Sequence, residues 1–119
     1  MSSTKEFVDY IAEQLQNAGL ISTRKMFGEY ALYCNEKIVG LICDNRLFIK
    51  QTDGGRNFIG IENIVEECAY PGAKPSLLIE DKIDDSVWLT ELIKITEKEL
   101  HEKKPKKKKG SKLQGGASC

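Results

Sequence analysis

The sequence has no long apolar run and no apolar segment near its start. None of its apolar stretches approaches the ~18–20 residues that a helix needs to cross a bilayer. The N-terminal residues, MSSTKEFVDY, have neither the basic start nor the apolar centre of a secretory signal. We therefore expect a cytoplasmic protein that has no membrane partner.

Histidine and paired cysteines are also scarce. The 119 residues include one histidine, His101, and four cysteines, none of which forms a CxxC pair. A zinc site would need an unusual ligand set, and a histidine near Glu99 and Glu102 is more typical of a solvated helix end than of a catalytic base. The sequence contains neither GxxxxGK followed by Ser or Thr nor GxGxxG, the loops that hold nucleotide phosphates. We expect no metal, no cofactor and no catalytic residue.

Acidic side chains predominate until the last 17 residues. Seven of the 18 basic residues are lysines of 103–119, so residues 1–102 carry 11 basic and 18 acidic side chains, a net charge of −7. A compact nucleic-acid-binding domain instead gathers its basic residues on one folded face. The last segment combines like charges, glycine and proline with almost nothing apolar. The composition therefore predicts a folded domain over 1–102 and a disordered lysine-rich tail over 103–119.

Two segments have the 3.6-residue apolar period of helices. The first is predicted at about residues 4–18 and begins with a capping box at Ser3. The second begins after Asp84 or Asp85 and carries Trp88 on its apolar stripe. We expect these helices to pack on a sheet, with Trp88 mostly buried.

Between the helices lie runs rich in Tyr, Ile, Val, Phe and Leu, which are typical of strands. The two-residue connections Asn35-Glu36 and Asp44-Asn45 join the first three runs, and Asn and Asp tolerate the positive φ of tight hairpins. In that register a disulfide between Cys34 and Cys43 is excluded. The sequence therefore predicts an α+β fold with a single antiparallel sheet of four to five strands, built from MFGEYALYC, KIVGLIC, RLFIK and SLLIE.

The stretch RKMFGEY, residues 24–30, combines two cations, an apolar pair, a glycine and an acid beside an aromatic residue. Side-chain alternation from Met26 onward predicts the entrance of a strand, with Arg24 and Lys25 outside the core. Gly28 removes a side chain where a strand bends or a helix approaches closely. We interpret the stretch as structural rather than catalytic.

The order of these motifs resembles the N-terminal domain of TfoX/Sxy proteins, and in particular a branch of stand-alone domains. The residues that carry the resemblance are RKMFG at 24–28, the apolar run to Cys34, LFIK at 47–50, YPGAKP at 70–75 and the last helix with Trp88. Together they cover about residues 5–102. The resemblance implies one antiparallel sheet with helices packed on it, similar to the secretion-chaperone-like fold.

The resemblance also implies regulation rather than catalysis. Full-length TfoX/Sxy proteins regulate natural competence together with the cyclic-AMP receptor protein at promoters. We therefore expect a non-enzymatic protein-interaction module with an unidentified protein partner, and we leave a homodimer open. The residues expected to make contacts are those of the two motifs and their neighbours: Arg24, Lys25, Phe27, Gly28, Lys50, Tyr70, Pro71 and Lys74.

An alternative hypothesis assigns a small-molecule or enzymatic function to the same region. In it, Arg24, Lys50 and Lys74 hold an anion. We prefer the interaction module because cations at strand ends are usually solvated. A protein partner captured from cells would favour the first hypothesis, whereas a strong thermal shift with one metabolite would favour the second.

The lysine-rich segment from Lys103 to Lys112 predicts weak nucleic-acid binding without sequence preference. Lysines release counterions from phosphates but supply no geometry that reads base edges. We expect the affinity for unrelated duplexes to be equal and to fall steeply between low and high salt. Fluorescence anisotropy at two salt concentrations measures this, and a strong preference for one sequence would contradict it.

Overall fold

The computed structural model describes residues 3–26 and 29–102. Within them the chain is an α+β domain with helices on a single antiparallel sheet, as predicted, although the sheet has six strands instead of four to five. None of the described helices is both long and apolar enough to span a membrane. The elements are α1 (Lys5–Gln14), β1 (Ile21–Met26), β2 (Glu29–Cys34), β3 (Lys37–Cys43), β4 (Arg46–Ile49), α2 (Asp53–Ile59), η1 (Ile61–Asn63), β5 (Glu66–Cys68), β6 (Pro75–Ile79), η2 (Asp81–Asp84) and α3 (Ser86–Glu102).

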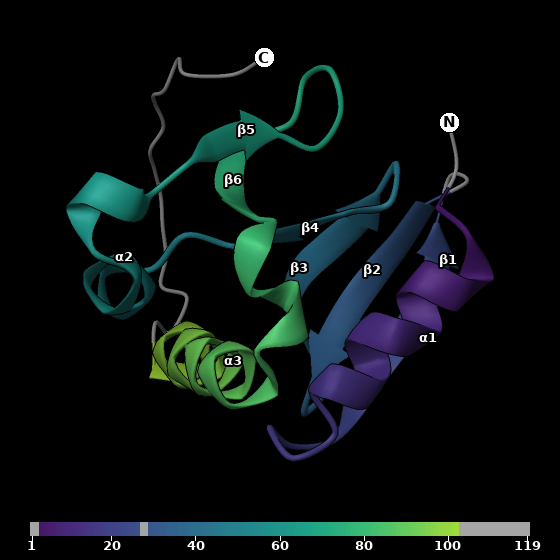
Figure 1. Cartoon of the computed structure of the whole chain (residues 1–119), viewed down its shortest axis with the longest axis horizontal. Coiled ribbons are helices and arrows are strands. Elements are labelled where there is room, and N and C mark those ends of the chain that lie inside the picture. The colour runs from purple at the N-terminus through teal and green to yellow at the C-terminus, as the bar shows by residue number, and fades with distance from the viewer. Residues whose placement is uncertain (1–2, 27–28, 103–119) are drawn as a thin grey trace.

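The strands follow the order β1-β2-β3-β4-β6-β5, and each neighbouring pair is antiparallel (Figure 1). The four residues of the two predicted turns, Asn35, Glu36, Asp44 and Asn45, all have positive φ, between 53° and 73°. These turns therefore form the hairpins that the sequence predicts. Cys34 and Cys43 are free thiols, as the register requires.

RKMFGEY is divided between two strands. β1 ends at Met26, β2 begins at Glu29, and these two residues pair with each other. The prediction of one strand that enters at Met26 was therefore wrong. The residues that end at Met26, ISTRKM, form an edge strand of their own. They are mostly polar, and the strand is held by its pairing along the whole of β2. Arg24 and Lys25 are exposed on this strand, as predicted.

α1 begins one residue later than the prediction and ends well before position 18. Its N-cap is Thr4, whose side-chain oxygen accepts a hydrogen bond from the backbone N–H of Phe7 at 3.2 Å. The predicted cap, Ser3, is buried instead, and its hydroxyl donates to the Glu29 carboxylate at 3.1 Å. Ser3 therefore fastens the start of the chain to the sheet and is not available to cap the helix.

One face of the sheet is covered by α1 and α3, which lie side by side beneath it in Figure 1. The carboxylate of Asp85 caps α3 by accepting from the backbone N–H of Trp88 at 3.1 Å, which confirms one of the two predicted caps. Trp88 is only partly buried, with its ring centroid 5.2 Å from that of Phe58. The fully buried side chains of this core include Ile11, Leu15, Leu32, Val39, Ile42, Leu47, Ile49, Leu77, Leu89, Leu92 and Ile93.

The other face of the sheet carries no helix in the described ranges, and we call it the helix-free face. Its cluster consists of Cys43, Phe48 and Leu78, with Leu41 and Ala69 packed against them. Leu41 pairs with Phe48, and Phe48 with Leu78, so the three form a row across β3, β4 and β6. This face is therefore apolar without a helix to cover it.

A β-bulge in β3 decides which residues face which side. Leu32 pairs with Gly40 and Tyr33 with Ile38, so Val39 is an extra residue between the two pairs. Because of it, Val39 lies under the helices although alternation alone would place it on the same side as Leu41.

Gly40 offers a direct test of the bulge. A β-carbon there would lie 2.3 Å from the carbonyl oxygen of Phe48, a backbone atom that belongs to the β3–β4 pairing. We expect Gly40→Ala to lower the free energy of unfolding by about 2–3 kcal/mol, measured by urea denaturation. Ser22→Ala, at an exposed position of β1, serves as a control that should change it by less than about 0.5 kcal/mol. An unchanged midpoint for Gly40→Ala would contradict the close approach.

Candidate functional site

The structure brings three of the predicted contact residues together. Lys50, Tyr70 and Lys74 line the same hollow on the helix-free face, although Lys50 follows β4 and the other two lie between β5 and β6. Pro71 is exposed in the same loop as Tyr70, between β5 and β6. The other predicted contacts do not join them: Arg24 and Lys25 lie on β1 and line none of the described hollows, and Phe27 and Gly28 lie outside the described residues.

The hollow has two adjoining parts that share Met26, Leu41 and Tyr70, and we call them together the sheet cleft. The first part has a volume of about 400 Å³ and is almost entirely apolar. Besides the shared residues it is lined by Glu29, Tyr30 and Cys43. It suits an apolar side chain or a small apolar group.

The second part of the sheet cleft, about 530 Å³, adds positive charge. Lys50 and Lys74 are both exposed side chains on its rim. Its remaining lining residues are Ile38, Gly40, Gln51, Ala73, Pro75 and Ser76. The sheet cleft as a whole therefore has an apolar floor and a cationic end.

Hydrogen bonds hold both walls of the cationic end. The side-chain amide of Gln51 donates to the carbonyl oxygen of Pro75 at 3.1 Å and so connects the end of β4 to the start of β6. The backbone N–H of Ala73 donates to the carbonyl oxygen of Tyr70 at 3.0 Å and closes the β5–β6 turn, in which Gly72 has a φ of 91°. Tyr70 remains 54% exposed, so its ring is available to a ligand or partner.

The two lysines on the rim of the sheet cleft, Lys50 and Lys74, have no carboxylate partner among the described residues. The pairs are Lys5–Asp9, Lys37–Glu97, Arg46 with Glu67 and Glu80, and Arg56–Glu66. Lys50 and Lys74 take part in none of them, nor does Arg24, whose guanidinium instead lies 5.4 Å from the ring centroid of Tyr33. The net charge of −7 therefore coexists with a local positive rim at the sheet cleft.

Cys43 is the one thiol among the described residues on the floor of the cleft, and it is not activated. Burial, followed by the nearby carboxylates of Glu29 and Asp44, raises the pKa of this thiol from its ordinary value of 9.0 to about 11. A thiol with so high a pKa is protonated at neutral pH and is a poor nucleophile. The described part of the chain also holds no cluster of three or more His, Cys, Asp or Glu side chains that fits a metal ion.

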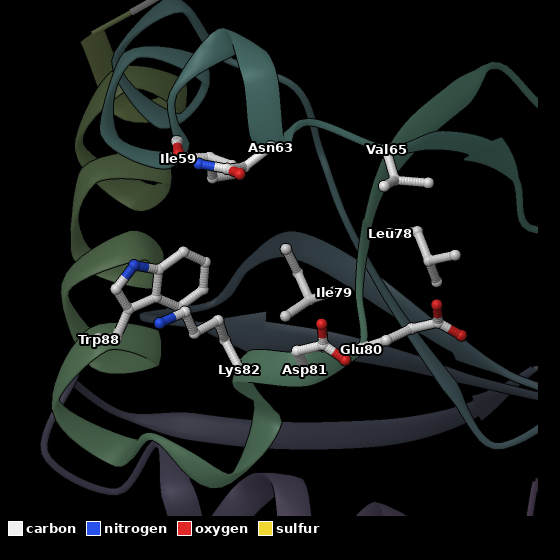
Figure 2. A pocket seen from close by; sticks show the side chains of 9 residues that line it. All are labelled: Ile59, Asn63, Val65, Leu78, Ile79, Glu80, Asp81, Lys82 and Trp88. Carbon is white, nitrogen blue, oxygen red and sulfur yellow. Dashed lines mark hydrogen bonds between the residues drawn. The ribbon is translucent and has the colours of Figure 1, made fainter.

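A separate cavity of about 340 Å³ lies where α2 and η1 approach η2 and the start of α3. We call it the Trp88 cavity. Figure 2 shows Trp88 on one side, Val65 and Leu78 on the other, and Ile79 between them. The lining also includes Ile59 and Asn63, and the consecutive polar residues Glu80, Asp81 and Lys82.

Sequence reasoning found only parts of these two sites. Lys50, Tyr70 and Lys74 were predicted because of the family motifs, but Met26 and Leu41 were interpreted as ordinary strand residues. The Trp88 cavity was missed, since its acidic residues look like a solvated connection between a strand and a helix. No local signal in the sequence indicates that η1 folds back toward them.

Because the pKa of Cys43 is raised, we expect the free energy of unfolding to fall at alkaline pH. The unfolded thiol ionises near 9.0 whereas the folded thiol keeps its proton until about 11, so stability is lost as the pH rises between these values. We expect the free energy of unfolding to fall less steeply from about pH 8 to about pH 10.5 in Cys43→Ala than in the wild type. Cys34, whose pKa burial also raises, is present in both proteins. Equal slopes in urea titrations at the two pH values would contradict the prediction.

Comparison with known sequences assigns the chain to a family. Residues 13–100 match the model of the TfoX N-terminal domain. The chain is also 36% identical to an uncharacterized 12.7 kDa protein in the trpE 5′ region of Spirochaeta aurantia, over 109 residues that cover 92% of this chain and 93% of that protein. The matched residues include every strand of the sheet and all the residues that line the cleft. The chain therefore belongs to the TfoX N-terminal domain family.

Proposed function

We propose that this chain is a non-enzymatic protein-interaction module and that its partner binds in the sheet cleft. The observation that carries the proposal is the combination of an apolar floor, an exposed tyrosine and two unpaired lysines on the helix-free face. Aromatic residues that lie beside apolar hollows are frequent energetic centres of protein interfaces. The matching partner segment would place an apolar side chain in the first part of the cleft and acidic side chains near Lys50 and Lys74.

Two further features favour binding over catalysis. The thiol in the cleft is protonated at neutral pH, and no other nucleophile with an adjacent base lines either part of the cleft among the described residues. The rim lysines lie on an otherwise acidic body, so they would attract an acidic segment and help to orient it. By analogy with the TfoX/Sxy family, we place this interaction in transcriptional regulation in the cytoplasm.

A second candidate function follows from the two lysines in one hollow. A small anion with an apolar group would contact Lys50 and Lys74 with its charge and Leu41 with its apolar part. In this case the domain is a sensor of a small molecule. Arg24 lies outside the described lining of the cleft, so this version relies on the two lysines alone.

Charge reversal at the rim tests the proposal. We expect Lys50→Glu with Lys74→Glu to reduce capture of the cognate partner from cell extract by about tenfold or more, because both rim charges would repel an acidic segment. Lys94→Glu with Lys98→Glu makes the same change in net charge at exposed positions of α3 and is the matched control. The partner captured by wild type should also be lost in Tyr70→Ala.

Equal capture by both double variants would reject the sheet cleft as the partner site. A screen of anionic metabolites by thermal shift decides the second candidate function. A shift that is lost in Lys50→Ala and in Lys74→Ala, with no protein captured through the cleft, would favour the small-molecule sensor. Sedimentation of both double variants shows whether the partner is a second copy of the chain.

A further inference from the structure

We propose that the Trp88 cavity binds an alkylammonium group, such as the side-chain amine of a lysine or a free organic amine. This site shares no lining residue with the sheet cleft and does not depend on the function proposed for it. The inference follows from the aromatic ring, the carboxylates and the ammonium group that the cavity already contains. The ring and the carboxylates favour a cationic ligand over an anionic or neutral one, and the ammonium group shows where such a ligand would lie.

The indole of Trp88 provides the main binding surface. Phe58 lies against it, with 5.2 Å between ring centroids, which fixes the ring in place. The ammonium group of Lys82 lies 5.7 Å from the centroid of the indole, close to the side chains that line the cavity in Figure 2. This distance is within the ~6 Å at which a cation is attracted to the face of an aromatic ring. Lys82 therefore shows that the site accommodates an ammonium group.

The polar atoms around the cavity are mainly acceptors. Asp81 is exposed and has no ion pair among the described residues, whereas Glu80 is 3.9 Å from the guanidinium of Arg46. The side-chain amide of Asn63 donates through Nδ2 to the carbonyl oxygen of Ile59 at 3.3 Å, which leaves its Oδ1 to accept. Among the described residues, Lys82 is the only cationic side chain in the lining. An ammonium ligand that displaces it would find a carboxylate, an amide oxygen and the ring.

The apolar lining sets the shape of the ligand. Ile59, Val65 and Ile79 surround a volume of about 340 Å³, which accepts a short alkyl chain behind the ammonium group. A lysine side chain has this structure, and seven lysines follow α3 in residues 103–119. The ligand can therefore come from the chain itself or from a separate amine. The chemistry of the site is the same for both sources.

Trp88 is the only tryptophan in the chain, so its fluorescence reports on this cavity alone. We expect n-butylammonium chloride, added to the full chain at constant ionic strength, to change the Trp88 emission in a saturable way. n-Butanol, which has the same alkyl chain without the charge, should not do so. Saturation by n-butanol at similar concentrations would overturn the proposal, because it would show an apolar site without selectivity for a cation.

We expect two substitutions to change the affinity for n-butylammonium in opposite directions. Lys82→Ala removes the competing ammonium group and should strengthen binding about threefold, whereas Asp81→Asn should weaken it about threefold, the size expected for exposed charge interactions. Glu91→Gln changes the net charge by the same amount as Asp81→Asn, at an exposed position of α3 outside the cavity, and should leave the affinity unchanged. All the substituted positions are exposed, so folding is not at risk. Absence of saturable binding in Lys82→Ala would overturn the proposal.

Removal of residues 103–119 distinguishes the two sources of the ligand. If the lysines of this segment occupy the cavity, the shortened chain should bind n-butylammonium more tightly than the full chain, and Asp81→Asn should abolish the difference. If the two lengths bind equally, the ligand is a separate amine. Equal thermal midpoints for both lengths would confirm that the comparison is made between folded proteins.

Discussion

The β-bulge at Val39 is the local constraint on which both faces of the sheet depend. Without the extra residue, strict alternation would place Val39 and Leu41 on the same face of β3. With it, Val39 and Ile42 complete the core under α1 and α3, while Leu41 and Cys43 become the floor of the sheet cleft. Gly40 makes the arrangement sterically feasible, since any β-carbon there would collide with the backbone of β4. The β-bulge at Val39 thus shapes both the core and the candidate site.

The parts of the fold that sequence predicted correctly are those with local causes. The hairpins at Asn35-Glu36 and Asp44-Asn45 need only residues that accept positive φ between strand-forming runs, and both are present. The edge strands escaped prediction because their stability comes from a neighbour rather than from their own composition. β1 has few apolar residues, and β5 is a three-residue strand that contains two glutamates. Ser3 was misassigned because its partners, including Glu29, are distant in the sequence.

The same distinction applies to the candidate sites. Lys50, Tyr70 and Lys74 were identified from motifs, but only the three-dimensional arrangement shows that one hollow unites them with Met26 of β1. β1 and the loop beside β5 belong to opposite edges of the sheet, so their approach depends on how the sheet curves and how the loop folds over it. Such long-range geometry is not encoded in any single motif. The Trp88 cavity was hidden for the same reason, because it forms between segments that are separate in sequence.

The order of the elements along the chain also has a consequence for synthesis on the ribosome. Strands β1 to β4 are joined by short turns, so this meander can pair as soon as it emerges. Its apolar face, however, is completed by Leu89, Leu92 and Ile93 of α3, the last described element to be translated. The part of this face that α3 covers therefore stays exposed until the final helix leaves the exit tunnel. Any delay in translation before α3 would lengthen the period in which the emerging chain is a client for chaperones.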